Sequence, residues 1–307
     1  MSRESLIDIL VFGGTGMLGH KMFQLLRQQF PKTFCTIRGS IEDEPVRQIG
    51  LFQNGQVVER FDATDFAGVE HLLLENRPSV VVNCIGLIKH RPESTEAIPS
   101  ITVNSILPHK LAEFCQRWGG RLIHFSTDCV FSGKKGNYRE DDLPDAEDLY
   151  GRTKFLGEVT SGSALTLRTS IIGRELLHSG SLLEWFLSQS HKRVPGYKRA
   201  LFSGVTTNHL AQVVGDLIRD HPNLSGLYNV ASQTISKFDL LCLLREAYDL
   251  DIEILQQDEF SCDRSLRGEK FAAAAGYVCP PWLELVSQLA NDDTSYNKWR
   301  TLKNEVL

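Results

Sequence analysis

The sequence lacks any feature typical of a membrane or nucleic-acid-binding protein. No apolar run approaches the ~18 residues that a helix needs to cross a bilayer, so we expect no membrane partner. The 33 basic and 38 acidic residues give a formal charge of −5 at pH 7. That mild acidity gives no electrostatic reason to expect nucleic acid or an anionic membrane surface as a partner.

Pairing patterns of cysteine and histidine are also missing. The seven cysteines include no C-x-x-C pair, and an odd number without framework spacing favours reduced thiols in the cytoplasm over disulfides. The nine histidines show no metal-ligand spacing, so we expect no metal site. The N-terminal segment has an apolar run that ends in glycines, which is typical of a first buried strand and not of a signal peptide.

Short apolar runs alternate with helical patterns in the first half of the chain. Such alternation indicates a parallel sheet covered by helices on both faces. We therefore predict an α/β fold of the Rossmann type, a doubly wound parallel sheet whose ligands gather at the carboxyl ends of its strands. The predicted strands are 7–12, 33–37, 57–61, 80–84 and 122–125, and the predicted helices are 17–29, 66–75 and 101–118.

Beyond residue 170 the pattern is looser and predicts a smaller C-terminal α/β lobe. A strand at 227–230 is expected to rejoin the main sheet, and the polar tail from Asn291 onward is expected to be a marginal helix or loose. Two polar loops are predicted at 194–204 and 260–267. The other predicted elements are helices at 182–190, 208–219, 237–248 and 281–289 and a strand at 252–255.

A glycine-rich loop follows the first predicted strand and opens the first predicted helix. Gly13, Gly16 and Gly19 allow a tight turn, close approach of the backbone to a pyrophosphate, and close packing of helix on strand. The helix N-terminus then offers free N–H groups and a partial positive charge to the anion. The G-x-x-G-x-x-G spacing favours the short-chain dehydrogenase type of nicotinamide site. Its other contacts would be Thr15, Met17 and Leu18.

The end of the second strand indicates which nicotinamide cofactor is bound. An acidic residue there would favour NAD by accepting from the ribose 2′-OH, but no carboxylate appears before Glu42. Arg38 can pair with a 2′-phosphate, so NADP(H) is preferred and NAD(H) stays possible; a solvated surface arginine is the alternative. Asp62 is placed to accept from the adenine amino group, or to cap a helix locally.

The candidate catalytic residues are a tyrosine and a lysine four positions apart. On a helix, Tyr150 and Lys154 lie on the same face. A tyrosine with its ordinary pKa near ~10 is a poor acid or base, and a nearby cation favours phenolate. Thr127, at the end of the fifth predicted strand, can donate a hydrogen bond to the substrate carbonyl that Tyr150 protonates.

Four segments together resemble the extended short-chain dehydrogenase/reductase family, and within it the dTDP-4-dehydrorhamnose reductase branch. They are GGTGMLG (13–19), NCIG (83–86), STDCVF with YREDDLP and YGRTKFLGE (126–158), and LRTS (167–170). The resemblance implies reduction of the 4-keto group of a nucleotide-linked deoxysugar with NAD(P)H. It places Thr127, Tyr150 and Lys154 on the catalytic triad, residues 1–170 with about 204–232 in the NAD(P)-binding domain, and about 171–203 with 233–307 in the substrate-binding lobe.

Further site residues follow from the same resemblance. Asn104 would support the lysine through water, with a polar group at a helix N-terminus as the alternative. Arg264 or Arg267 would grip the diphosphate of the substrate, although each could be a solvated loop arginine. The remaining implied contacts are Cys84, Ile85 and Gly86 with the cofactor, and Asp128 and Cys129 with the substrate.

Two departures from the family pattern concern the sugar. Cys129 stands where an aromatic residue is usual, and Ile171 stands where a tryptophan is usual. A nucleotide-sugar dehydratase or epimerase that retains its cofactor is an alternative, but dehydration usually needs Asp-Glu after the threonine and this chain has Asp128-Cys129. A non-catalytic regulatory subunit is a second alternative, against which the complete triad argues. A homodimer is possible.

Overall fold

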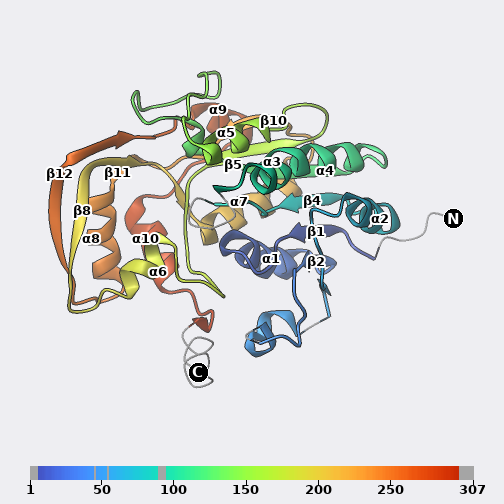
Figure 1. The fold of residues 1–307 in the computed structure, drawn as a ribbon, viewed down its shortest axis with the longest axis horizontal. Coiled ribbons are helices and arrows are strands. Elements are labelled where there is room, and N and C mark those ends of the chain that lie inside the picture. The colour runs from blue at the N-terminus through green and yellow to red at the C-terminus, as the bar shows by residue number, and fades with distance from the viewer. Residues whose placement is uncertain (1–5, 45, 54, 89–94, 297–307) are drawn as a thin grey trace.

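A seven-stranded, wholly parallel sheet forms the centre of the protein (Figure 1). The computed structural model describes residues 6–44, 46–53, 55–88 and 95–296. The strand order is β10-β6-β5-β4-β1-β2-β3. The strands are β1 (Ile9–Phe12), β2 (Thr33–Thr36), β3 (Val57–Val58), β4 (Val80–Asn83), β5 (Arg121–Thr127), β6 (Leu165–Thr169) and β10 (Gly226–Asn229).

This order confirms the predicted doubly wound α/β fold. From β1 the chain runs outward through β2 to β3, then returns to β4 and continues outward to β10. The reversal between β1 and β4 leaves a crevice at the carboxyl ends of these two strands, where ligands of such sheets bind. The predicted strand at 227–230 does rejoin the main sheet as β10, whereas the third strand spans two residues instead of five.

Each face of the sheet is covered by helices because successive side chains of a strand point to opposite faces. Ile9 and Val11 of β1 lie in the core with α1 and α7, while Leu10 and Phe12 lie in the core with α2 and α4. The helices of this part are α1 (Met17–Gln29), α2 (Phe66–Asn76), α3 (Ala97–Ile101), α4 (Leu107–Gln116), α5 (Leu149–Leu156), α7 (Thr207–Asp220) and α9 (Glu269–Ala275).

The predicted helix at 101–118 contains a π-helical turn. It begins earlier, at Ala97, and the π turn Thr102–Ile106 separates α3 from α4. Pro108 has no N–H and so cannot donate to the carbonyl of Asn104 four residues before it. Gly157 lies against that carbonyl so closely that a Cβ atom would clash with it. The irregular turn therefore lets the segment after α5 approach this helix.

A smaller three-stranded sheet lies beside the large one, on the left in Figure 1. Its order is β11-β8-β12, and buried apolar side chains join it to α6, α8 and α10. Its elements are β11 (Ile235–Ser236), β8 (Arg193–Phe202), β12 (Glu253–Asp263), α6 (Leu182–Leu187), α8 (Lys237–Ala247) and α10 (Trp282–Ala290). A separate pair is formed by β7 (Ile171–Ile172) and β9 (Val205–Thr206). The predicted boundaries of the two lobes stay a prediction.

The two loops predicted in this lobe were partly wrong. Most of 194–204 and the first residues of 260–267 lie in strands. Residues 194–204 mostly form β8, in which Val194, Ala200 and Phe202 are buried. Pro195 is tolerated because β11 pairs with the far end of β8, so among the described residues no strand pairs with Pro195 on that side of β8. Residues 260–263 belong to β12, which continues past a register shift between Gln257 and Ser261.

The polar tail is ordered over the part that the structure describes. Asp292, Thr294 and Tyr296 make hydrogen bonds or an ion pair with α1, so the expectation of a loose or marginal helical tail was wrong for 292–296. The remaining part of the predicted tail, 297–307, lies outside the described residues. All seven cysteines are free thiols. Within the described ranges, no helix is long and apolar enough to cross a membrane.

Candidate active site

The glycine-rich loop forms a tight turn between β1 and α1. Gly13 has a φ of +86°, a conformation that side chains rarely adopt. The Gly14 N–H donates to the carbonyl of Thr36 across 2.8 Å, and the Gly16 N–H donates to the carbonyl of Gly13 across 3.0 Å. A Cβ atom on Gly19 would overlap the Gly13 carbonyl, so only glycine lets the helix approach the loop this closely. The residues therefore fit a pyrophosphate cradle.

A cleft of about 360 Å³ connects this loop with the predicted catalytic residues. Its walls come from α1, from the segments after β4 and β5, from α5, and from the segment after β6. The predicted residues that line it are Thr15, Gly16, Met17, Leu18, Cys84, Ile85, Gly86, Thr127, Asp128, Cys129, Tyr150 and Lys154. Ile171, one of the two departures from the family pattern, lines it as well.

The candidate catalytic residues meet at the end of β5. Thr127 is the last residue of β5. Its hydroxyl donates to the Asp128 carboxylate at 3.1 Å, accepts from the Cys129 N–H at 3.1 Å, and interacts with the Tyr150 hydroxyl on α5. Asp148 caps α5 by accepting a hydrogen bond from the Gly151 N–H at 2.9 Å. One turn after Tyr150, the Lys154 ammonium donates to the carbonyl of Phe125 across 2.6 Å. The helix and the strand thus hold the three side chains in one place.

Burial has the largest effect on the pKa values of Tyr150 and Lys154. Burial raises the pKa of Tyr150, the Cys129 thiol raises it further, and the hydrogen bond from Thr127 opposes the shift. The predicted effect of Lys154 on the pKa of this phenol stays a prediction. Burial lowers the pKa of Lys154 to about 8, against the opposing charge of Glu158. The site holds a neutral phenol beside a lysine that titrates close to neutral pH.

Asn104 contacts the residue before the catalytic lysine. Its side-chain oxygen accepts from the Leu87 N–H at 2.9 Å, and its amide donates to the Leu87 carbonyl at 3.0 Å and to the Thr153 hydroxyl at 3.2 Å. These bonds tie the segment after β4, which carries Gly86 in the cleft wall, to α5. Its predicted role toward Lys154 through water stays a prediction.

Two cations of the small lobe surround the carboxylate of Asp128. Burial raises the pKa of Asp128, and the charges of Lys237 and Arg264 oppose that shift. Arg264 also donates to the Phe131 carbonyl at 2.9 Å, and its Nη1 lies 3.7 Å from the Cys129 sulfur. Arg264 therefore reaches the predicted substrate residues from the opposite lobe.

Lys237 was missed by reasoning from sequence. It is the first residue of α8, and its ammonium lies 3.8 Å from the centre of the Phe202 ring. Ser236 caps α8 by accepting from the Asp239 N–H at 3.0 Å, and the helix begins at Lys237 as predicted. The effect of Lys237 on Asp128 depends on how two distant segments pack, which the sequence around Lys237 does not reveal. Arg267 lies apart from this group: it pairs with Glu269 at 2.6 Å beside a separate hollow of about 540 Å³.

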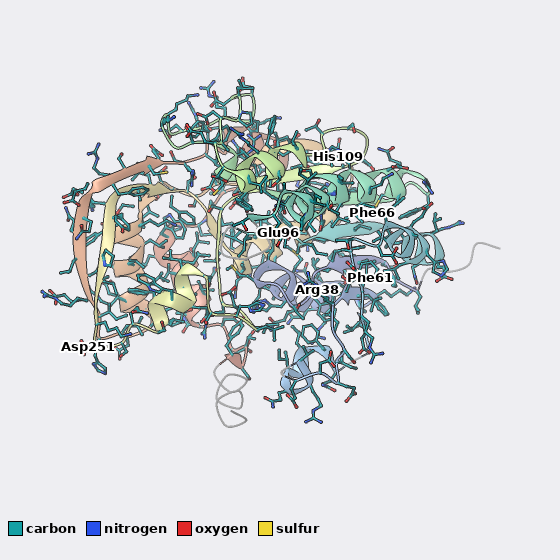
Figure 2. The ribbon with its side chains drawn as sticks, viewed as in Figure 1. Arg38, Phe61, Phe66, Glu96, His109 and Asp251 are labelled. Carbon is teal, nitrogen blue, oxygen red and sulfur yellow. The ribbon has the colours of Figure 1, made fainter. Side chains whose placement is uncertain are left out.

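The residues predicted to select NADP(H) lie at the end of β2. The Phe61 N–H donates to the Ile37 carbonyl at 3.0 Å, which places Asp62 near Arg38, whose side chain is exposed (Figure 2). The Asp62 carboxylate accepts from the N–H and the hydroxyl of Thr64 at 2.9 and 2.7 Å. The alternative role as a helix cap was wrong, because the N-cap of α2 is Asp65.

The carboxylate of Glu59 was also not predicted at this edge of the sheet. It accepts hydrogen bonds from the Ser40 hydroxyl and, at 2.8 Å, from the Ile41 N–H. Both bonds lower the pKa of Glu59. An acidic side chain from the segment after β3 thus reaches the loop that follows Arg38, which reading along β2 alone could not reveal.

A phosphate-binding loop, a doubly wound sheet and a Thr-Tyr-Lys cluster in one cleft define the short-chain dehydrogenase/reductase class. The chain belongs to the family described as RmlD substrate binding domain, which matches residues 7–293. The resemblance of the sequence to the dTDP-4-dehydrorhamnose reductase branch of this class is thereby confirmed.

Individual relatives are similar at moderate identity. The dTDP-4-dehydrorhamnose reductase of Streptomyces griseus is 33% identical over 150 residues, which cover 48% of this chain and 43% of that protein, so the chain spans less than half of that relative. Methionine adenosyltransferase 2 subunit beta of Xenopus tropicalis is 24% identical over 264 residues, covering 78% of this chain and 72% of that protein.

Solved structures share the fold. The dTDP-4-dehydrorhamnose reductase of Bacillus anthracis in complex with NADP superposes with a TM-score of 0.73 at 19% identity, covering 92% of this chain and 97% of that chain. The UDP-glucose 4-epimerase of Thermus thermophilus in complex with NAD superposes with a TM-score of 0.72 at 18% identity, covering 95% and 98%.

Proposed function

We propose that this chain is an NADPH-dependent reductase of a 4-keto-6-deoxy nucleotide sugar. The observation that carries the proposal is the meeting of Thr127, Tyr150 and Lys154 in the cleft that begins at the glycine-rich loop. The exposed Arg38 supports NADPH over NADH, because an arginine can pair with a 2′-phosphate. The S. griseus relative and the B. anthracis structure, by their names, support the class of substrate and the cofactor.

The residues of the site have distinct roles in the proposed reaction. The loop that carries Gly13, Gly16 and Met17 would hold the dinucleotide, which would supply the hydride when bound. Tyr150, kept neutral by burial, gives its phenolic proton to the oxygen of the substrate carbonyl. The Thr127 hydroxyl donates a hydrogen bond to the same oxygen, where negative charge develops.

Lys154 completes the proton transfer. Its ammonium stabilises the phenolate that Tyr150 becomes, because an opposite charge nearby favours the ionised form. Its carbonyl partner, Phe125, lies two residues before Thr127 on the same strand, so the ammonium stays near the end of β5. With a pKa of about 8, Lys154 is protonated at neutral pH and can return a proton to the phenolate.

The substrate would lie against Asp128 and the cations of the small lobe. Asp128 accepts hydrogen bonds from sugar hydroxyls, and Lys237 and Arg264 favour its ionised form. Arg264, which contacts the sulfur of Cys129, is the better candidate for holding the phosphates, whereas Arg267, beside its own hollow, is the weaker candidate. A cytoplasmic location and a homodimer stay predictions.

The test asks whether a keto sugar causes net oxidation of NADPH, and whether the purified chain retains a bound cofactor. NADPH is mixed with a panel of 4-keto-6-deoxy nucleotide sugars, and nicotinamide absorbance is followed over time. Oxidation of NADPH that depends on one of these sugars supports the proposal. Retention of a tightly bound cofactor through purification, with no net oxidation of NADPH, would instead favour an epimerase or dehydratase.

A non-catalytic subunit is the second candidate, favoured by similarity to methionine adenosyltransferase 2 subunit beta. In that case the fold would bind a nucleotide and a partner protein without turnover. The Thr127, Tyr150 and Lys154 cluster counts against it, because a binding role needs no proton donor. A stable complex with another protein, in a chain that reduces none of the keto sugars, would favour this candidate.

A further inference from the structure

The carbonyl oxygen of Gly16 accepts two hydrogen bonds from one residue. The backbone N–H of His20 lies 3.1 Å away, and Nδ1 of the His20 ring lies 2.8 Å away. Gly16 is the N-cap of α1 and lines the cleft together with Met17. Because the peptide group is planar, the orientation of the Gly16 carbonyl also fixes the direction of the Met17 N–H on the other side of that plane.

His20 is in turn held by the C-terminal part of the chain. Its Nε2 lies 2.8 Å from the hydroxyl of Tyr296, and both residues are buried. A carbonyl can only accept, so Nδ1 carries the hydrogen and Nε2 accepts from the phenol. Burial lowers the pKa of His20 to about 4, so the ring is neutral at pH 7 and this tautomer is the one that satisfies both nitrogens.

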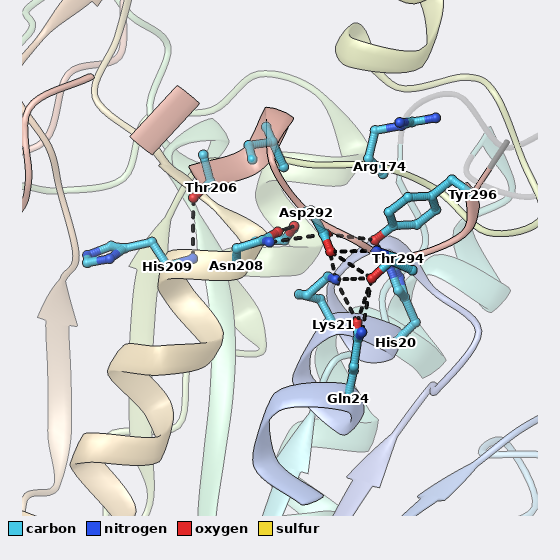
Figure 3. A network of polar contacts seen from close by, with 12 residues as sticks. His20, Lys21, Gln24, Arg174, Thr206, Asn208, His209, Asp292, Thr294 and Tyr296 are labelled. Atoms are coloured by element: carbon cyan, nitrogen blue, oxygen red, sulfur yellow. Dashed lines mark hydrogen bonds and ion pairs between the residues drawn. The ribbon is translucent and has the colours of Figure 1, made fainter. Parts of the chain in front are cut away.

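A buried ion pair anchors the segment that carries Tyr296 (Figure 3). Lys21 and Asp292 lie 2.6 Å apart, and their side chains are 1% and 6% exposed. The Lys21 ammonium also donates to the Thr294 hydroxyl at 2.9 Å, and Asn208 of α7 donates to Asp292 at 3.1 Å. Residues 292–296 are thus fixed against the first turns of α1.

Tyr296 also contacts the opposite wall of the cleft. The Arg174 guanidinium lies 4.8 Å from the centre of the Tyr296 ring and pairs with Glu184 at 2.9 Å. The Glu184 carboxylate accepts from the N–H of Glu175 at 2.8 Å, and Glu175 lines the cleft. One tyrosine therefore joins the cofactor loop to the segment after β7.

We propose that Tyr296 and His20 are positioning residues for the dinucleotide, which orient the Gly16–Met17 peptide toward the pyrophosphate. This inference rests on the proposed function, since it needs a dinucleotide in the cleft. Neither residue touches the reacting atoms. Their loss would weaken cofactor binding while the Thr127, Tyr150 and Lys154 cluster stays intact.

The test compares two tyrosines that make the same kind of bond. Tyr296→Phe removes one hydroxyl and keeps the ring against Arg174. The matched control is Tyr277→Phe, because the Tyr277 hydroxyl lies 2.8 Å from Nε2 of His209, away from the loop. Titration calorimetry of the full chain with NADPH should show Kd raised roughly 3- to 10-fold by Tyr296→Phe, the range expected for one hydrogen bond. The control should leave Kd unchanged, and equal effects of the two substitutions would overturn the inference.

His20→Gln provides a second variant, which keeps the ion pair of the tail. It should also raise Kd and the KM for NADPH while kcat changes little, and Tyr296→Phe should add nothing in the His20→Gln background. A further rise in Kd when Tyr296→Phe is added to His20→Gln would overturn the inference. An unchanged Kd in His20→Gln alone would overturn it as well, even if the tyrosine variant proved too unstable to titrate. Failure of the unaltered chain to bind NADPH would instead refute the proposed function, and this inference with it.

Discussion

Lys154 donates a hydrogen bond to the backbone carbonyl of Phe125, 2.6 Å away, and so ties the catalytic helix to the strand that ends in Thr127. The bond uses a carbonyl two residues before the strand end, and the Thr127 hydroxyl at that end donates to the Asp128 carboxylate at 3.1 Å and interacts with Tyr150. The bond therefore fixes the position of α5 relative to β5. Substituting Lys154 or Thr127 should therefore affect catalysis more than folding.

The protonation of Lys154 should set the alkaline limit of activity. Burial lowers the pKa of this lysine to about 8, and loss of its proton removes the cation that stabilises phenolate. We expect kcat/KM to fall as the pH rises through about 8, with Kd for NADPH changing less over the same range. A kcat/KM profile that stays flat to pH 10 would contradict this role.

Arg38 should determine the preference for NADPH. Because a charge-assisted hydrogen bond contributes about 1.5–3 kcal/mol, Arg38→Ala should lower kcat/KM for NADPH roughly 10- to 100-fold and leave NADH almost unaffected. Arg47→Ala is the matched control, since Arg47 is exposed and paired with Glu44 in the segment after β2. An equal loss with both cofactors would show that Arg38 acts on the fold and not on the 2′-phosphate.

The buried ion pair of Glu158 and Arg168 should matter for stability. Their side chains are 4% and 1% exposed and lie 2.7 Å apart, and the Ser126 hydroxyl donates to Glu158 at 2.6 Å. Glu158→Ala leaves an unpaired buried guanidinium and should lower the free energy of unfolding by about 3–5 kcal/mol. Urea denaturation measures this change.

The exposed pair of Arg193 and Glu253 is the control for that experiment. It has the same two-bond geometry, with 2.6 and 2.9 Å between the atoms, but it lies at the surface. Glu253→Ala should change the free energy of unfolding far less than Glu158→Ala, because solvent screens the exposed pair. Similar costs for the two substitutions would mean that burial does not govern the strength of these pairs.

Lys237 should influence the substrate and not the cofactor. Its charge opposes the effect of burial on the pKa of Asp128, so Lys237→Met should favour the neutral carboxyl and weaken the hydrogen bonds that it accepts from the sugar. We expect KM for the keto sugar to rise roughly 10-fold, as for loss of one charged hydrogen bond, with Kd for NADPH unchanged. A similar rise in KM for the sugar and in Kd for NADPH would show that Lys237 does not act on the substrate alone.

Local patterns predicted the large sheet and the cofactor loop. The alternating faces of β1, the glycines at 13, 16 and 19, and the one-turn spacing of Tyr150 and Lys154 are all set within a few residues. They could be read along the sequence because neighbouring residues determine them.

Contacts between distant segments could not be predicted in the same way. Strand β8 contains Pro195 and Gly196 and finds its main partner, β12, some sixty residues later, so its own composition resembles a loop. The position of Lys237 beside Asp128, and of Tyr296 beside His20, depends on how whole elements pack. The composition of residues 291–296 is polar and resembles a loose tail, although the side chains of Asp292 and Tyr296 are buried against α1.

The central claim is that Tyr150 supplies the proton while the sugar carbonyl is reduced, and Tyr150→Phe tests it most directly. NADPH oxidation with the best keto sugar and NADPH binding by calorimetry are measured on the same preparation. We expect turnover to fall by about 10²- to 10⁴-fold, the usual contribution of a positioned acid, with Kd for NADPH within about 2-fold of the unaltered chain. Full turnover in the phenylalanine variant would contradict the account.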